Sequence, residues 1–310
     1  MRAPENDTGL EAFYVQLDAA ITGARPQGRA TALARALLAL GGVLAILEDA
    51  GEPAHVRNDY VRAYLGARGP SPFDRGSPFE HFVAENYGRM GVPAAVTAVR
   101  RPTVMSFITA ADGEGLADRT QRRFFSDGSL PDDAVVDRGT TTAEVMVDAR
   151  RSLPYAYPRL PRLELKVMGS RHYAQASDKR RLLAYERVPG RVRFFLDEAV
   201  YADTARVLLP EIAGYGAGLI NHLFRAEIHI EVADGAAQLS LTGAQGDVRK
   251  GEIRVFSEDG SGLRTALATT VASSTPARFA IPAGAKKIAA VLRGEDDAGE
   301  LVAVGEAAIR

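Results

Sequence analysis

The chain has 310 residues, 46% of them hydrophobic and 25% charged, and a formal net charge of −1. This balance predicts a folded protein with more than one domain and excludes a global electrostatic attraction to nucleic acid or to an anionic membrane. The chain has no cysteine, which excludes disulfide bonds and thiolate metal sites, so any zinc ion would need histidine and carboxylate ligands.

The N-terminal part of the chain predicts two helices, over residues 8–24 and 28–50. In the second helix, leucines recur at the helical period: Leu33, Leu37, Leu40 and Leu44. The second helix is expected to end at Glu52-Pro53, because the proline nitrogen has no hydrogen to donate. No cationic start followed by an apolar run occurs, so we expect no signal peptide in this numbering and a soluble protein.

A third helix is predicted from Ser77 to about Tyr87. Ser77 is a favourable N-cap, and Pro78 takes the first helical position, where its missing N–H group is tolerated. Glu80 stands at the third position, which completes the pattern of a capping box.

Residues 88–205 carry weaker signals. The predicted elements are a helix over Gly115–Phe125, an ambiguous segment over Thr140–Arg150, an extended segment over Leu153–Pro161, and short strands over Leu163–Val167 and Arg191–Leu196. A long helix is then expected from Asp197 to about Phe224. No apolar run reaches the length of a membrane-spanning helix, and the best candidate, Val207–Phe224, is better explained as a buried helix.

After Arg225 the pattern changes to short β segments separated by Gly, Asp and Ser turns. About seven strands are predicted: Glu227–Val232, Gln238–Thr242, Glu252–Ser257, Arg264–Val271, Arg278–Ile281, Lys287–Arg293 and Leu301–Ile309. Evenly spaced short strands with polar turns are typical of a β-sandwich. We therefore predict a mainly helical domain at 1–225, with room for small β additions, and a β-sandwich domain at 226–310.

The end of the second helix carries the residues with the most chemical potential. Asp49 and His55 lie on either side of the Glu-Pro break, and acid and imidazole at a helix end are what a metal site in a helical bundle uses. Ala45 stands one turn before Asp49, where a further ligand would be expected. Other roles compete: His55 as donor to a backbone carbonyl, Asp49 as partner of Arg57 or of local backbone donors.

At Asp49-x5-His55 and Ser77-Pro-Phe-Glu80 the chain resembles the zinc-dependent phospholipase C/P1 nuclease superfamily. Further segments are similar to a bacterial branch of that family: LG at 40–41, PAHVRND at 53–59, LADRTQRRFFSDGSLP at 116–131 and LLPEIAGYGAGLINHLFR at 208–225. The resemblance implies an all-helical bundle that binds up to three zinc ions, and a secreted protein. Its motifs are His-x3-Asp-x5-His and His-x3-Glu.

Mapped onto this chain, the motifs become Ala45-x3-Asp49-x5-His55 and Gly76-x3-Glu80, so both leading histidines are missing. No histidine precedes His55, and the complete three-zinc cluster therefore cannot form. The remaining candidate ligands are Asp49, His55 and Glu80. Three protein ligands can hold one zinc ion with a water, but the resemblance assigns His55 and Glu80 to one ion and Asp49 mainly to the other two.

Two functions follow. In the first, the protein is a degenerate family member without the full zinc site, a scaffold or binding protein whose β-sandwich contacts a protein or surface partner. In the alternative, it is a zinc-dependent phosphoesterase-type hydrolase with a reduced site at Asp49, His55 and Glu80. Arginine doublets such as Arg122-Arg123 are better explained as solvated faces than as phosphate or nucleic-acid sites, since acidic residues are interspersed among them. There is no Walker, Rossmann or G-x-S-x-G motif.

Overall fold

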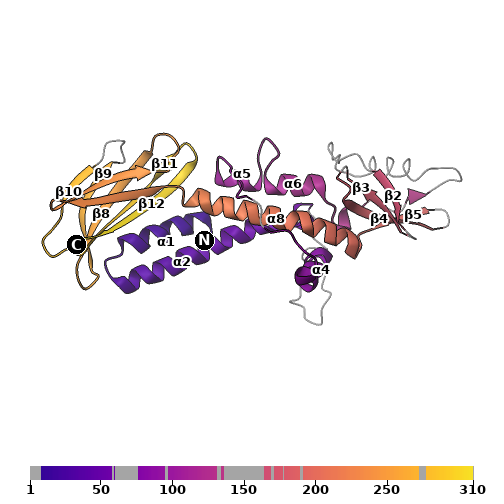
Figure 1. Cartoon of the computed structure of the whole chain (residues 1–310), viewed down its shortest axis with the longest axis horizontal. Helices are drawn as coiled ribbons and strands as arrows, with labels where there is room; N and C mark the ends of the chain where they lie inside the picture. The colour runs from indigo at the N-terminus through magenta and orange to yellow at the C-terminus, as the bar shows by residue number, and fades with distance from the viewer. Residues whose placement is uncertain are drawn as a thin grey trace, which may run out of the picture. The chain divides into compact units, whose positions relative to one another are not determined.

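The computed structural model describes residues 8–57, 59, 76–94, 97–130, 134–135, 164–168, 171–176, 178–188, 191–271 and 277–309. The chain divides into two compact units (Figure 1). The terminal unit comprises residues 1–46, 99–104 and 217–310, and the central unit comprises residues 47–98 and 105–216. The predicted segments Thr140–Arg150 and Leu153–Pro161 lie outside the described residues.

The terminal unit contains one seven-stranded sheet in the order β10-β7-β6-β12-β11-β8-β9. Its strands are β6 (Glu227–Ala233), β7 (Ala236–Thr242), β8 (Arg249–Glu258), β9 (Arg264–Val271), β10 (Ala277–Ala280), β11 (Lys287–Asp296) and β12 (Gly299–Ala308). Neighbours are antiparallel except β12 and β6, which are parallel. All seven predicted strands exist, but they form one nearly closed, barrel-like sheet rather than a two-sheet sandwich.

The sheet of the terminal unit buries residues on both faces. Its interior contains alternate aliphatic residues of five strands, among them Ile228, Leu239, Ile253 and Leu292. The other face of β11 and β12 is covered by α1 (Leu10–Thr22), whose buried residues include Phe13, Tyr14 and Leu17. This second covered face explains why β11 is buried almost continuously instead of at every second residue.

The five predicted helices are all present, and their ends lie within two residues of the predicted ones. Those that carry the main motifs are α2 (Pro26–Asp49), α4 (Pro78–Asn86), α6 (Leu116–Arg123) and α8 (Glu198–Leu223). Smaller helices are α3 (Pro53–Val56), η2 (Tyr87–Arg89), α5 (Val104–Ile108) and η3 (Asp127–Ser129). The helix α8 is unbroken through its glycines and Pro210.

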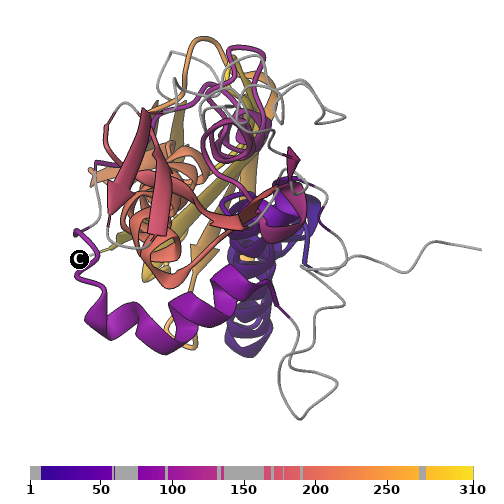
Figure 2. The ribbon, with the colours of Figure 1, turned by 90° about the vertical axis from the view of Figure 1, so that its right-hand side faces the viewer.

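The prediction of a mainly helical bundle was wrong, because the central unit contains a five-stranded antiparallel sheet. Its order is β1-β5-β4-β3-β2, with β1 (Ala134–Val135), β2 (Glu164–Met168), β3 (Arg171–Gln175), β4 (Arg181–Val188) and β5 (Arg191–Phe195). In Figure 2 this sheet, in red, faces the viewer. Four successive residues of β4, Leu182–Tyr185, are all buried, so the strand lacks the period-two pattern by which a half-buried strand is recognised.

Among the described residues, α2 is long and apolar enough to cross a membrane by length and composition alone. Its most apolar 18-residue window has a mean hydropathy of 2.0, and 33% of that window is buried. Core helices and signal sequences pass the same test, so α2 is not a clear transmembrane segment. The expected best candidate, Val207–Phe224, does not meet it.

Candidate functional site

The helix starts at α3 and α4 are joined by one buried carboxylate. Glu52 is the N-cap of α3: its Oε2 accepts a hydrogen bond from the backbone N–H of His55 at 2.8 Å, and its Oε1 accepts one from Ser77 Oγ at 2.7 Å. Ser77 is the N-cap of α4, and the predicted capping box with Glu80 is present, with Ser77 N donating to Glu80 Oε2 at 2.6 Å. Glu52 and Ser77 are 6% and 2% exposed.

The structure brings all three predicted ligands together around the imidazole of His55. Nδ1 lies 3.5 Å from Asp49 Oδ1, and Nε2 lies 4.0 Å from Glu80 Oε1. The imidazole is 13% exposed, whereas the side chains of Asp49 and Glu80 are 60% and 40% exposed. The site is therefore a half-open acid–imidazole–acid cluster.

This arrangement does not fit a single metal ion with three protein ligands. The two ring nitrogens of an imidazole point in different directions, and Asp49 and Glu80 lie at opposite nitrogens of His55. An ion at Nε2 could also reach Glu80, because two bonds of roughly 2 Å span such a separation, but Asp49 would then serve to orient Nδ1–H. In the part of the chain that the structure describes, no group of three metal-ligating side chains is found.

Position 76 lies directly beside the Glu80 carboxylate. A Cβ atom built on Gly76 would lie 3.2 Å from Glu80 Oε2 and 3.5 Å from His81 Nε2. The spacing Gly76-x3-Glu80 thus places a side chain at 76 where it would meet the carboxylate. The Nε2 atom of His81 approaches the same position.

Sequence reasoning missed the part that Glu52 plays. Burial, together with the negative charge of Glu80, raises the pKa of Glu52, although its hydrogen bonds from Ser77 and from the His55 backbone oppose the shift. The only local signal was an acidic residue directly before Pro53, at the N-cap of a one-turn helix. Nothing local indicated its partner Ser77, 25 residues away.

Two of the segments that carry the family resemblance meet in the central unit. Arg57 donates to the backbone carbonyls of Gln121 and Phe124, and Gly128 N donates to Asp59 Oδ2 at 2.6 Å. A Cβ atom on Gly128 would lie only 2.2 Å from Asp59 Oδ1, so this contact requires glycine. The PAHVRND segment is therefore fixed by backbone contacts with residues 121–128.

The cavity next to the cluster is too small for a substrate. It has a volume of about 10 Å³ and is lined by Glu52, Ser77, Asp127, Tyr201 and Thr204 among others. That is room for about one water molecule, which such polar groups could bind. Two of these lining residues contact each other: Tyr201 Oη lies 3.0 and 2.8 Å from the two carboxylate oxygens of Asp127.

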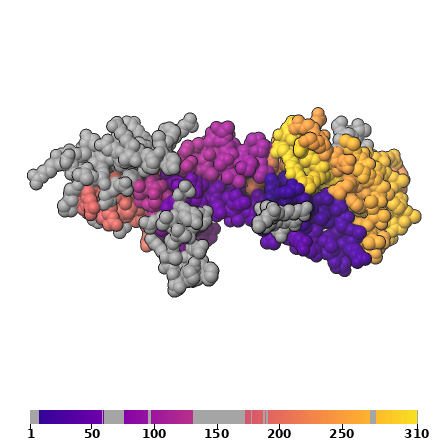
Figure 3. Space-filling view, turned by 180° about the vertical axis from the view of Figure 1, so that it is seen from behind, coloured from indigo at the N-terminus to yellow at the C-terminus, as the bar shows by residue number. Residues whose placement is uncertain are grey.

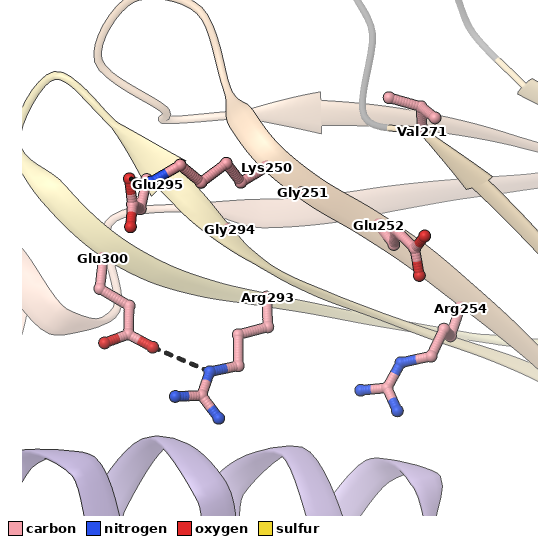
Figure 4. Close-up of a pocket in the computed structure, with 9 residues that line it drawn as sticks. All are labelled: Lys250, Gly251, Glu252, Arg254, Val271, Arg293, Gly294, Glu295 and Glu300. Carbon is pink, nitrogen blue, oxygen red and sulfur yellow. Dashed lines mark hydrogen bonds and ion pairs between the residues drawn. The ribbon is translucent and has the colours of Figure 1, made fainter.

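The terminal unit has a much larger open groove of about 840 Å³ (Figure 4). It is lined by Lys250, Gly251, Glu252, Arg254, Val271, Arg293, Gly294, Glu295 and Glu300. Most of its charges are already paired: Arg293 with Glu300 and with Glu11 of α1, Arg254 with Asp18 of α1, and Lys250 with Glu295. Among the described residues, Glu252 forms no ion pair. The groove and its α1 partners together contain more acidic than basic side chains, so they carry an excess of negative charge.

The arginines of the doublet Arg122-Arg123 form ion pairs with acidic residues of the same unit. Arg122 pairs with Glu114, and Arg123 pairs with Glu211 of α8 at 2.5 Å. In the basic run Lys179-Arg180-Arg181, Arg181 makes two hydrogen bonds to Asp203, at 2.7 and 2.8 Å. These guanidinium groups stabilise the central unit rather than offering an open phosphate site.

No protein-family model matches the chain, and no curated protein matches it either. Among solved structures, the chain is similar to pectate lyase PelI from Erwinia chrysanthemi in complex with tetragalacturonic acid. The identity is 11% over 26% of this chain and 27% of that chain, with a TM-score of 0.20. A likeness at this level carries no argument about fold or function.

Proposed function

We propose that the protein is a catalytically silent relative of the zinc-dependent phospholipase C/P1 nuclease-like proteins and acts as a scaffold or binding protein. The observation that carries the proposal is the placement of Asp49 and Glu80 at opposite nitrogens of His55. With Ala45 and Gly76 at the two leading ligand positions, the donors that remain do not converge. The proposal rests on these residues and not on a helical bundle.

The groove of the terminal unit supports a binding role. Pockets for small drug-like ligands are mostly apolar, whereas this groove is lined mainly by charged side chains. Because acids outnumber bases once Glu11 and Asp18 of α1 are counted, we assign it to a cationic group on a partner, with Glu252 as the acid available for it.

Catalytic silence is tested with a general phosphodiester substrate. The purified chain, with and without added zinc chloride, is incubated with bis(p-nitrophenyl) phosphate, and release of p-nitrophenol is compared with buffer containing zinc alone. We expect no excess over the zinc control. Turnover that disappears in both His55→Ala and Glu80→Ala would overturn the proposal.

The assignment of the groove is tested by titrating a tetralysine peptide and a tetraglutamate peptide into the chain by calorimetry. We expect weak binding of tetralysine alone, lost in Glu252→Gln and retained in the matched control Glu231→Gln, whose carboxylate is 70% exposed on β6. Equal binding by Glu252→Gln and the wild type would remove the groove from the proposal.

A second candidate is the zinc-dependent phosphoesterase with a reduced site, favoured by the 4.0 Å separation of His55 Nε2 and Glu80 Oε1. Those two groups would hold the ion, and zinc supplies an activated water when bound. In this chain Asp49 would keep the Nδ1 proton in place. Zinc that co-purifies in stoichiometric amount and is lost in His55→Ala would favour this candidate.

A further inference from the structure

The two edge strands of the sheet in the terminal unit differ in how well they are protected against pairing with another strand. Edge strands are usually short or carry charged residues or proline, because their unpaired backbone groups can bind a further strand. β10 has four residues, Arg278 among them, and Pro282 follows two residues after its end. β9 has eight residues, and none of those after Arg264 is charged or proline. β9 is therefore the edge strand that lacks this protection.

The last four residues of β9, Ala268–Val271, form a regular antiparallel ladder with β8, beyond a β-bulge. They alternate in burial: Ala268 and Thr270 are half-buried, whereas Thr269 and Val271 are exposed. Among the strands that the structure describes, β9 is hydrogen-bonded to β8 alone. Every second N–H and C=O group of this stretch therefore points to an edge without a strand partner in the described part of the chain.

Exposed apolar side chains stand at both ends of β9. Leu263, directly before the strand, is 43% exposed, and Val271, its last residue, is 71% exposed. No other large hydrophobic side chain among the described residues after 226 is exposed. Figure 3 shows atoms of these C-terminal strands, in orange and yellow, at the surface of the terminal unit. Leu267 of β9 and Phe279 of β10 pack against the core but remain half-buried, so an apolar side chain on the inner face of an added strand has core residues to cover.

This edge lies beside the acid that the groove leaves available. Val271 is directly opposite Glu252 in the ladder of β9 and β8 (Figure 4), and both residues line the groove. Neighbouring strands are about 4.8 Å apart, so a residue opposite Val271 on an added strand would lie roughly 10 Å from the Glu252 backbone. A lysine there would pack its apolar stem on Val271 and bring its ammonium group toward the Glu252 carboxylate.

We propose that Ala268–Val271 of β9 binds an extended segment of a partner protein by strand addition, with a basic residue of that segment opposite Val271. This inference rests on the function proposed above, because it takes the cationic group assigned to the groove and adds the form in which the partner presents it. Main-chain hydrogen bonds supply the affinity, and alternate side chains supply the specificity. The inward residues of the segment are apolar, and the outward residue beside Thr269 is neutral, because Arg254 stands opposite Thr269.

A second copy of the chain is the competing occupant, and its charges do not fit. The only charged residue of β9 is Arg264, which is 6% exposed and donates to Glu258 and Glu306 of its own chain. A β9 strand from a second copy would therefore bring no available cation to Glu252. Charge complementarity favours a different protein that carries a basic residue within an extended segment.

The test uses the full chain and a fluorescein-labelled, C-terminally amidated peptide, Thr-Val-Lys-Val-Thr, whose order is the same in both directions. Two further peptides carry N-methyl groups, one on both valine nitrogens and the other on the lysine and last threonine nitrogens. The N–H groups of a strand alternate between its two edges, so only one methylated set can face β9. By fluorescence anisotropy we expect the unmethylated peptide to bind, and one methylated peptide to bind at least about tenfold more weakly, because two hydrogen bonds are lost. The other methylated peptide should bind as the unmethylated one does.

Two controls separate strand addition from simple charge attraction. The peptide Val-Val-Lys-Thr-Thr has the same composition and charge without the alternation, and it should bind more weakly. Glu252→Gln should weaken binding of the unmethylated peptide, whereas the matched control Glu231→Gln, on β6, should not.

The outcomes distinguish this inference from the assignment of the groove. Equal binding by both methylated peptides, with binding still weakened in Glu252→Gln, would overturn strand addition and leave the groove assignment standing. Tetralysine that binds where Thr-Val-Lys-Val-Thr does not would have the same meaning. Binding of no peptide would overturn both. A chain that is dimeric by sedimentation velocity, and that the unmethylated peptide converts to monomer, would assign the edge to a second copy and overturn the proposal.

Discussion

Two clusters of charged residues, one in each unit, differ in the burial and the hydrogen bonding of their carboxylates. In the terminal unit the Asp296 carboxylate has 0% exposure and accepts from Arg225, at 3.1 and 2.7 Å, and from the backbone N–H groups of Gln245 and Ala298. In the central unit, Asp49 and Glu80 stand 3.5 and 4.0 Å from His55 and remain 60% and 40% exposed.

The stability of the fold depends on the cluster around Asp296 more than on the cluster around His55. Burial alone would raise the pKa of Asp296, but the Arg225 guanidinium and the two backbone donors outweigh it and lower that pKa. Removing one partner of a buried ion pair leaves an uncompensated charge in the interior and is strongly destabilising. The carboxylates around His55 retain contact with water, and of the two only Glu80 also stabilises a helix, through the capping box of α4.

The largest loss of stability is expected from breaking the buried Arg225–Asp296 ion pair. Arg225→Ala leaves Asp296 buried without its cation and should lower the free energy of unfolding by about 3–5 kcal/mol, measured by urea denaturation. The control is the next residue: Asp297→Ala removes an exposed pair with Arg249, whose side chains are 62% and 64% exposed, and should cost less than about 1 kcal/mol. Equal losses of unfolding free energy in the two variants would show that the fold does not depend on the Arg225–Asp296 pair.

Removal of the Ser77 hydroxyl is expected to come second. Ser77→Ala deletes both the N-cap of α4 and the hydrogen bond to buried Glu52, and we expect a loss of about 2 kcal/mol. Ser261→Ala, whose hydroxyl bonds Asp259 at an exposed turn, serves as the control and should change stability by less than half as much. An unchanged unfolding midpoint in Ser77→Ala would contradict the account of the helix junction.

The two buried carboxylates should have opposite pH dependence. The pKa of Glu52 is raised in the folded protein, so the folded state holds its proton longer, and stability falls as pH rises from the ordinary glutamate pKa to the raised one. The pKa of Asp296 is lowered, so its contribution is present above the ordinary aspartate pKa and is lost as pH falls below it. Glu52→Gln should flatten the first slope in urea titrations at pH 4–8, and an unaltered slope would contradict the shift.

The smallest loss of stability is expected at Tyr14, which lies beside the Arg225–Asp296 ion pair. Tyr14 Oη donates to the backbone carbonyl of Glu300 at 3.1 Å, which Arg225 also contacts. Burial and the nearby Glu300 carboxylate raise the pKa of Tyr14 to about 12. Tyr14→Phe should cost about 1 kcal/mol, and alkaline difference spectra should lose one tyrosine that ionises near pH 12. A variant with the wild-type alkaline spectrum would refute that assignment.

Local signals in the sequence predicted local structure well. The capping box of Ser77 and Glu80 lies within four residues, and the seven C-terminal strands are separated by recognisable turns, so both were confirmed. Two strands of the central sheet, β2 and β5, were predicted, but β4 was missed because its residues Leu182–Tyr185 are all buried and show no alternation. Glu52–Ser77 and Arg225–Asp296, 25 and 71 residues apart, depend on tertiary contacts that no local pattern encodes.

We propose that Asp49, His55 and Glu80 form an acid–imidazole–acid cluster rather than a zinc site. Calorimetric titration of zinc chloride into the metal-free chain tests it most directly, with Ala45→His/Gly76→His as the variant that restores both missing histidines. We expect no stoichiometric binding by the wild type and tighter binding by the restored variant, because position 76 lies beside Glu80. Stoichiometric zinc binding by the wild type that is lost in His55→Ala would contradict it.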